Sequence, residues 1–254
     1  MFSNYIINFS VPSYKSIGRF LKLNEFYDRK SELKPPLTNA NKLKRLAFAN
    51  KWMENGICTL GNVIWTDETR VASHPNNRRI SVWTNKKEAP IQVKMHSGGN
   101  SVMFWGCFSK HGTGPLVSIQ GSMNQTEYIS ILKEEFIPEF KKAKRAISGH
   151  WRLMHDNAPC HTARAVKAFL REQRVKVIEW PPFSPDLNPI ENIWQWMKQK
   201  LETEFPICNS DEEIEARIFE IWQTITPEMC SAYFANYYKR LLLVIAANGG
   251  YTKY

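Results

Sequence analysis

Three acidic residues, far apart in the chain, stand where predicted strands end or a predicted helix begins. Asp67 and Asp156 each close a stretch typical of a β-strand, and Glu191 lies at the start of a helix, with 34 residues between it and Asp156. Acids at two strand ends and one helix start can meet at one edge of a sheet. Because all three offer only oxygen atoms, they suit a hard cation such as Mg²⁺. The sequence therefore predicts a divalent-metal site.

Glu191 also has a simpler interpretation as part of a helix cap. Asn188 is a favoured N-cap, Pro189 fits the first helical position, and Glu191 stands where a capping-box carboxylate bonds back to the cap. An isolated Asn-x-x-Glu is more often a cap than a ligand, so this alternative stays open. The apolar positions of the helix follow at helical spacing: Ile190, Ile193, Trp194, Met197 and Leu201. Packing of this stripe would hold Glu191, which lies off its centre, at a fixed point.

The segments next to the acids indicate how the carboxylates are aimed. The apolar run Val175–Trp180 is typical of a strand, and it stops at a pair of prolines because proline cannot donate to a sheet ladder. In the strand Val63–Asp67, side chains alternate between the two faces, so Asp67 and Glu68 point in opposite directions. We therefore expect Glu68 to support the site rather than share its metal.

The remaining pattern is that of an α/β protein. Further strands are predicted at Ile80–Trp83, Val93–His96, Ser101–Phe108, Pro115–Gln120 and Arg152–Asp156. Helices are predicted at residues 13–23, 38–54, 124–144 and 162–174, and from the caps Ser210 and Thr226 onward. This order of elements predicts a mixed sheet flanked by helices.

The helix at residues 38–54 carries both apolar and basic positions. Its apolar face is predicted at Leu43, Leu46, Ala47 and Met53. Its basic side chains are expected either to contact phosphates or, as the default for such a helix, to lie in solvent: Lys42, Lys44, Arg45 and Lys51.

Composition limits the function classes. The chain has 254 residues, 43% of them hydrophobic, and Lys and Arg outnumber Asp and Glu by 34 to 24. A net charge of +10 favours a polyanionic partner, nucleic acid before membrane. Five scattered cysteines without a Cys-x-x-Cys pair fit a reduced protein and argue against a zinc site. The longest apolar run, Leu241–Ala247, is too short to cross a bilayer, so no membrane partner is expected.

Four sequence blocks surround the acids in order. They are Val63–Arg70, Ser97–Phe108, His155–Ala163 and Trp180–Trp194. Together with the Asp, Asp and Glu at this spacing, they resemble the Tc1-like branch of the Tc1/mariner transposases, whose catalytic signature is DD34E. The resemblance extends from about Ser13 to Tyr254.

The resemblance implies a fold, a chemistry and a cellular place. The fold would be ribonuclease H-like, and Asp67, Asp156 and Glu191 would be the catalytic metal ligands. Two Mg²⁺ ions, with Mn²⁺ as a substitute, would support cleavage of double-stranded DNA at transposon ends and strand transfer into a TA target. Glu68, Asn157 and His161 would support the ligands. The protein would work in the nucleus, as a candidate homodimer.

The resemblance also suggests where DNA is bound. The basic segment at residues 13–23 resembles the last helix of a second helix-turn-helix unit, and the part of the family pattern that precedes this helix is absent. We therefore expect residues 1–35 to be a partial DNA-binding remnant with its linker, and residues 36–254 to be the catalytic domain. The candidate DNA contacts are Lys15, Arg19, Lys22, Arg78, Arg79 and Lys198.

Two other functions remain open at the level of sequence. One is a truncated or domesticated transposase remnant that binds DNA without transposing; the intact acid triplet argues for the enzyme and the short N-terminal region for the remnant. The other is a ribonuclease H-like nuclease acting on RNA–DNA hybrids, which fits the fold class but not the four sequence blocks.

Overall fold

The computed structural model describes residues 13–23, 36–54, 60–72, 101–205, 208 and 210–254. Helix α1 (Tyr14–Leu23) belongs to one compact unit, and the other described helices and strands belong to a second. The predicted helix at residues 13–23 is confirmed, and its Ile17 and Phe20 side chains are exposed. The strands predicted at Ile80–Trp83 and Val93–His96 lie outside the described residues.

The second unit is built on a mixed five-stranded sheet, as predicted. Its strand order is β3-β2-β1-β4-β5, with β1 and β2 antiparallel, β2 and β3 antiparallel, and β4 and β5 parallel to β1. The bounds are β1 Val63–Ala72, β2 Ser101–Ser109, β3 Gly112–Ile119, β4 Arg152–Met154 and β5 Lys176–Val177.

Helices cover both faces of this sheet. Those that precede β4 are α2 Asn39–Glu54, α3 Gln125–Ile131 and α4 Ile137–Ala146, with the π-helical turn η2 Leu132–Phe136 joining α3 to α4. Those that follow are α5 Pro159–Thr162, α6 Arg164–Glu172, the 3₁₀ turn η3 Pro185–Leu187, α7 Ile190–Glu204, α8 Asp211–Gln223, α9 Pro227–Ala235 and α10 Tyr237–Ala246. Ser210 and Thr226 cap α8 and α9 through bonds from Glu213 N (3.2 Å) and Met229 N (3.3 Å), as predicted. Among the described residues, none of the helices has the length and apolar character needed to cross a membrane.

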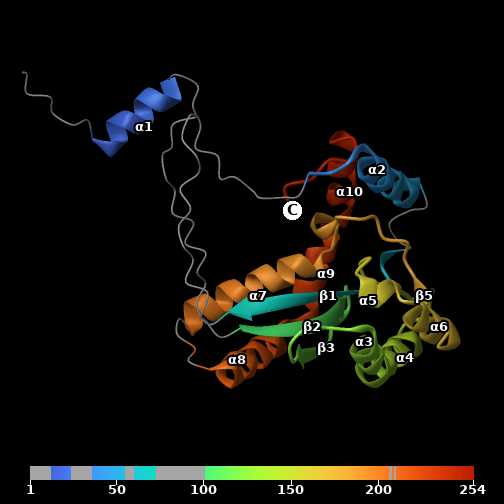
Figure 1. Ribbon diagram of the computed structural model, residues 1–254. Helices are drawn as coiled ribbons and strands as arrows, with labels where there is room; N and C mark the ends of the chain where they lie inside the picture. Colours follow the sequence, from blue (N-terminus) through green and yellow to red (C-terminus); the bar gives the residue numbers. More distant parts are fainter. Residues whose placement is uncertain (1–12, 24–35, 55–59, 73–100, 206–207, 209) are drawn as a thin grey trace, which may run out of the picture. The chain divides into compact units, whose positions relative to one another are not determined.

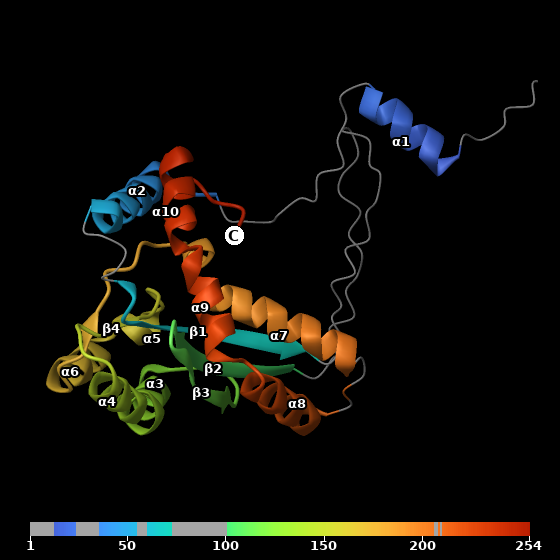
Figure 2. The same cartoon turned by 180° about the vertical axis from the view of Figure 1, so that it is seen from behind.

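The alternation of side chains along β1 separates two apolar cores. Val63 and Trp65 point into the core formed with α2, α7, α8, α9 and α10, whereas Ile64 points into the core formed with α3, α4 and α6. Figure 1 shows α7 alongside β1 and α2 beside α10, and Figure 2 shows the same neighbours from behind. The acids follow this alternation, so Asp67 faces α7 and Glu68 faces the opposite core.

The strands differ in length from the prediction, most of all β1 and β5, while β3 begins earlier, at Gly112, and β4 ends earlier, at Met154. β1 continues past Asp67 to Ala72 because β2 pairs with it as far as that residue. The run Val175–Trp180 contributes only Lys176 and Val177 to β5, because its neighbour β4 has only three residues and offers few partners at this edge. Asp67 therefore lies within β1, just beyond the point where pairing with β4 stops.

The predicted buried face of α2 was wrong in part: Met53 packs against the core and Leu46 is half-buried, but Ala47 is exposed. Leu43 is 66% exposed, whereas Arg45 is fully buried together with Phe48, Ala49 and Trp52. A buried guanidinium needs a partner, and Arg45 has one in Asp186, 2.7 Å away on η3. Arg45 is therefore neither a phosphate contact nor a solvated charge.

Candidate active site

Asp67 lies on the face of β1 that α7 covers. Its Oδ1 accepts a hydrogen bond from the backbone N–H of Glu68 (2.8 Å), and its Oδ2 accepts one from the side-chain amide of Asn188 (3.2 Å). The same amide donates to the carbonyl oxygen of Thr66 at 3.2 Å. Asn188 thus ties the loop before α7 directly to the strand that carries Asp67.

Glu191 occupies the first turn of α7, where the predicted capping box does not form. The cap residue is Pro189, one position later than expected, and it makes no side-chain capping bond. The side-chain oxygen of Asn188 accepts a long bond from Ile190 N (3.4 Å), while its amide is committed to β1. The carboxyl group of Glu191 instead lies close enough to that of Asp67 for each to influence the pKa of the other.

Asp67 and Glu191 are close enough to affect each other's ionisation. Burial raises the pKa of the Asp67 carboxyl well above its usual range, and the charges of Glu191 and Glu68 add to the effect. Burial also raises the pKa of Glu191, against the opposing influence of Lys198, of the hydrogen bond to Asp67 and of Arg240. Two carboxyl groups in contact cannot both ionise without a large electrostatic cost, so this pair favours a shared proton or a bound cation.

A glycine allows α7 to lie this close to the sheet. Gly106 of β2 pairs with Asp67 across the ladder and so faces the same side. A Cβ atom at position 106 would lie only 2.6 Å from Cη2 of Trp194 and 3.1 Å from Cδ1 of Leu116. Trp194 is one turn beyond Glu191, so this contact sets how near the first turn of α7 comes to β1.

Asp156 lies just after the neighbouring strand β4, which ends at Met154 and not at Asp156 as predicted, and its side chain is bound to a histidine. It stands two residues past the last β1–β4 pair, as does Asp67. Its Oδ1 accepts from Nδ1 of His161 (2.7 Å) and from the backbone N–H of Ala158 (2.8 Å). Burial alone would raise the pKa of Asp156, but these two bonds lower it. Asp156 is therefore held as an anion by His161 and the backbone of Ala158.

His161 links two acids that lie on different strands. Its Nε2 is 3.3 Å from Oε1 of Glu68, while its Nδ1 binds Asp156. Burial alone would lower the pKa of His161, but the bond to Asp156 and the Glu68 carboxylate raise it to about 10. At neutral pH His161 is thus an imidazolium that balances the charges of Asp156 and Glu68.

His155, which also flanks Asp156, is part of the packing beneath His161. Its Nδ1 lies 2.8 Å from the hydroxyl of Tyr128, and its ring stacks on that of His161 at 5.1 Å with an interplanar angle of 6°. Burial and the charge of His161 lower the pKa of His155 to about 3. A neutral His155 supports the His161 ring from below.

Two other predicted site residues, Asn157 and Lys198, interact with different groups near the acids. Asn157 donates its amide to the carbonyl of Trp180 at 2.9 Å and so holds the loop rather than the acids. Lys198, a candidate DNA contact, is exposed on α7, and its charge lies near Glu191 and Asp67. Desolvation lowers its pKa, and these two acids oppose that effect.

The candidate DNA contacts at the N-terminal end are only partly described. Lys15 and Arg19 are exposed on α1, and Lys22 belongs to the same helix. Arg78 and Arg79 lie outside the described residues.

Sequence reasoning missed a buried polar group behind the site. Asp186, on the loop before α7, is 3% exposed and binds Arg45 of α2, the backbone N–H and hydroxyl of Thr252, and, through its carbonyl, Arg240 of α10. No local signal in the sequence marks this group, because Arg240 directly follows Lys239 before the apolar run Leu241–Ala247 and the two basic residues cannot be told apart by pattern.

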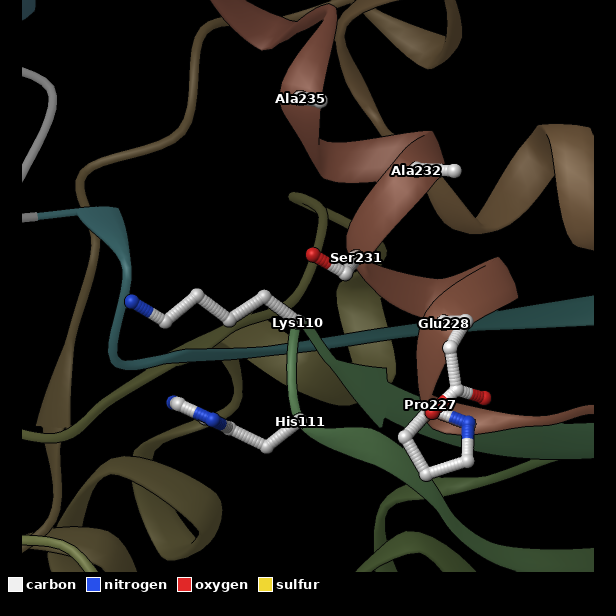
Figure 3. Close-up of a pocket in the computed structure, with 7 residues that line it drawn as sticks. All are labelled: Lys110, His111, Pro227, Glu228, Ser231, Ala232 and Ala235. Carbon is white, nitrogen blue, oxygen red and sulfur yellow. The ribbon is translucent and has the colours of Figure 1, made fainter.

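A hollow among the described residues lies away from these acids. It has a volume of about 590 Å³ and lies between Lys110 and His111 of the β2–β3 turn and the residues of α9, with Pro227 and Glu228 at the start of that helix (Figure 3). None of the predicted site residues lines it, and its wall carries both basic and acidic side chains. The candidate site is thus the edge of the sheet and not this hollow.

The donor set fits a divalent cation, although the acids are not gathered around one point. Within the described ranges, no three His, Cys, Asp or Glu side chains form a metal-binding group, because Asp156 turns toward His161. The nearby carboxyl groups of Asp67 and Glu191 need positive charge if both are to ionise. Oxygen donors of this kind suit Mg²⁺ or Mn²⁺ rather than a softer metal.

The chain is similar in sequence to a family of endonucleases and to known transposases. Residues 62–213 match the family model described as DDE superfamily endonuclease. The chain is 31% identical to the transposable element Tcb1 transposase of Caenorhabditis briggsae and 30% identical to the transposable element Tc1 transposase of Caenorhabditis elegans. Both alignments cover 97% of this chain and 90% of the relative.

Solved structures share the fold at lower sequence identity. The Mos1 transposase paired-end complex with the left transposon end matches with a TM-score of 0.72 at 18% identity, over 93% of this chain and 71% of that one. The Mos1 catalytic domain with raltegravir and Mg matches with a TM-score of 0.67 at 18% identity, over 86% of this chain and 100% of that one. The predicted ribonuclease H-like fold class is confirmed.

Proposed function

The chain belongs to the Tc1-like transposases, within the DDE superfamily of endonucleases, and on that premise we propose that Asp67, Asp156 and Glu191 hold its catalytic divalent cations. The observation that carries this proposal is the contact between the carboxyl groups of Asp67 and Glu191, from a strand and a helix 124 positions apart in the chain. A cap or a surface acid would have no reason to meet another acid in a partly buried place.

The reaction of a transposase explains why such a site is needed. Attack on a phosphodiester requires an activated oxygen nucleophile, a stabilised leaving oxygen and relief of negative charge at phosphorus. Two Mg²⁺ or Mn²⁺ ions held by the three acids would supply these. The Mos1 structures with Mg and with Mn, which have this fold, support the use of a divalent metal.

Each residue of the site has a separate task. Asp67, central in the sheet and between the other two acids, would contribute to both ions, Asp156 to one and Glu191 to the other. The imidazolium of His161 fixes the Asp156 carboxylate, and the amide of Asn188 fixes that of Asp67. These bonds prevent the ligands from changing rotamer between reaction cycles.

The substrate we propose is double-stranded DNA, cut at transposon ends and joined to a TA target in the nucleus. A net charge of +10 and the exposed Lys15 and Arg19 on α1 support binding to a polyanion. The Mos1 complex with a transposon end has the same fold and supports the same kind of partner. The 3′-hydroxyl freed by cleavage would act as the nucleophile for joining.

A nicking assay tests the proposal. The purified chain is incubated with supercoiled plasmid in Mg²⁺ or Mn²⁺, with EDTA as the blank and Glu191→Gln as the inactive variant. Glu202→Gln is the matched control, because Glu202 is an exposed acid on the same helix. Nicking by the wild type and Glu202→Gln, but not by Glu191→Gln, is the expected result. A folded wild-type protein that binds DNA and cuts nothing in either metal would support the binding remnant instead.

A further inference from the structure

The loop before α7 is held by an arginine at full burial. Arg45 donates Nη1 to Oδ1 of Asp186 at 2.8 Å and Nη2 to Oδ2 at 2.7 Å, a bidentate pair with both side chains out of contact with solvent. Its remaining bonds go to Phe183 O, Ser184 Oγ, Gly249 O and Gly250 O. A loop fixed at this many points has one conformation.

A second buried arginine joins this loop to the first turn of α7. Arg240 of α10 is 2% exposed, donates Nη1 to the carbonyl of Asp186 at 3.0 Å and donates Nη2 to the side-chain oxygen of Asn192. The ring of Tyr254 covers its guanidinium, with the ring centroid 4.5 Å away. We call Arg45, Asp186, Arg240 and Asn192 the arginine brace.

The brace acts next to the catalytic acid. Asn192 follows Glu191 in the chain, so fixing Asn192 fixes the backbone from which Glu191 projects. Three residues before Glu191, Asn188 is tied to Thr66 and Asp67 of β1. The first turn of α7 is thus held from β1 on one side and from α10 on the other, with Glu191 between the two attachments.

We propose that Arg240, acting through Asn192, is a positioning residue that holds Glu191 against Asp67 in the geometry that a divalent cation requires. Neither residue touches the reacting atoms, and the proposal rests on the proposed function. The two acids repel each other when both are ionised, so without an external restraint the first turn of α7 would move Glu191 away from Asp67. Arg240 supplies that restraint, and its positive charge also attracts Glu191.

The variant that tests this is Asn192→Ala and not a change of Arg45. Removing Arg45 would leave the Asp186 carboxylate buried and unpaired, which threatens folding itself. Asn192 is only partly buried and contributes a single acceptor to the brace. Gln199→Ala is the matched control, because it removes an exposed amide from α7 two turns farther from Glu191.

Two readouts are measured on the full chain. One is the Mn²⁺ concentration that gives half of the maximal rise in melting temperature; the other is the Mn²⁺ concentration that gives half-maximal plasmid nicking. For Asn192→Ala both concentrations should rise about tenfold, the lower end of what groups supporting metal ligands usually contribute, while nicking at saturating Mn²⁺ stays close to that of the wild type. Gln199→Ala should match the wild type in both.

A double variant separates positioning from general stability. Arg240→Lys reaches only one of the two acceptors, so it should raise the half-saturating Mn²⁺ concentration through the same bond. Asn192→Ala with Arg240→Lys should then be no worse than the more affected single variant. If Asn192→Ala lowers the melting temperature but leaves both Mn²⁺ concentrations at the wild-type value, the brace is structural only and the inference is wrong. A wild type that neither responds to Mn²⁺ nor nicks DNA would instead overturn the proposed function.

Discussion

Gly106→Ala is the change that most directly probes how the site is assembled. The added Cβ would lie 2.6 Å from Cη2 of Trp194, a separation that real Cβ atoms do not show, and 3.1 Å from Cδ1 of Leu116. The leucine can rotate, but Trp194 is fully buried and stacks on Trp222 with ring centroids 5.4 Å apart. The clash therefore has to be relieved by movement of α7 away from the sheet.

The magnitude follows from overpacking of a rigid ring. Inserting a methyl group into a well-packed core typically costs about 1–3 kcal/mol of stability. Because Trp194 cannot rotate away from the new methyl group, we expect a cost in the upper half of this range, about 2–3 kcal/mol. For a domain of this size that corresponds to a fall in melting temperature of about 4–12 °C. Because Trp194 is one turn beyond Glu191, plasmid nicking should fall together with stability.

Thermal unfolding followed by circular dichroism measures the effect, with Trp194→Phe as the partner substitution. The smaller ring leaves room for the new methyl group, so the two changes should be non-additive by about 1 kcal/mol or more. Gly18→Ala is the control, since no heavy atom of the described structure lies within 4 Å of a Cβ at that position on α1. The close packing of Trp194 against Gly106 would be refuted if Gly106→Ala were as stable as the wild type. It would also be refuted if the double variant lost stability in a strictly additive way.

Two further predictions concern the buried charges. Arg45→Ala should lower the free energy of unfolding, measured in urea, by about 3–5 kcal/mol, because it leaves Asp186 buried without its partner. Substitution of the exposed Lys44 by Ala should change the same free energy by less than about 0.5 kcal/mol. Equal effects of the two substitutions would contradict the buried pair. His161 has a raised pKa, of about 10, so its stabilising charge is fully present below the unfolded-state pKa of 6.5 and is lost as the pH rises through 10. In EDTA, wild-type stability should therefore fall between pH 6.5 and 10 more steeply than that of His161→Gln; parallel curves would show that His161 is not charged in the folded protein.

The sheet and its acids were accessible from the sequence for physical reasons. Apolar runs that end in an acid mark strands, and the alternation along Val63–Asp67 placed Asp67 and Glu68 on opposite faces, which the contacts with Asn188 and His161 confirm. The expected meeting of the acids at one edge of the sheet is explained by the parallel pairing of β1 and β4, which brings Asp67 and Asp156 to the same level.

The supporting groups could not be predicted in the same way. In α2, Arg45 stands among lysines, and the sequence pattern predicts that all of these basic residues are exposed to solvent. Its partner Asp186 is 141 residues away in the chain. Only tertiary packing distinguishes it from Lys44. The capping box does not form for a similar reason: the amide of Asn188 donates to the carbonyl of Thr66 and the carboxylate of Asp67, and in this orientation its side-chain oxygen accepts only the long bond from Ile190 N.

The measurement closest to the central claim is the rate of metal-dependent DNA cleavage by Glu191→Gln, compared with Glu202→Gln. The substitution removes a negative charge beside Asp67, so the metal-free protein should be at least as stable as the wild type. Cleavage should nevertheless fall by about a thousandfold or more, since the three acids act as one unit. Wild-type cleavage by a folded Glu191→Gln protein would contradict the account, because Glu191 would then be no ligand of the catalytic metal.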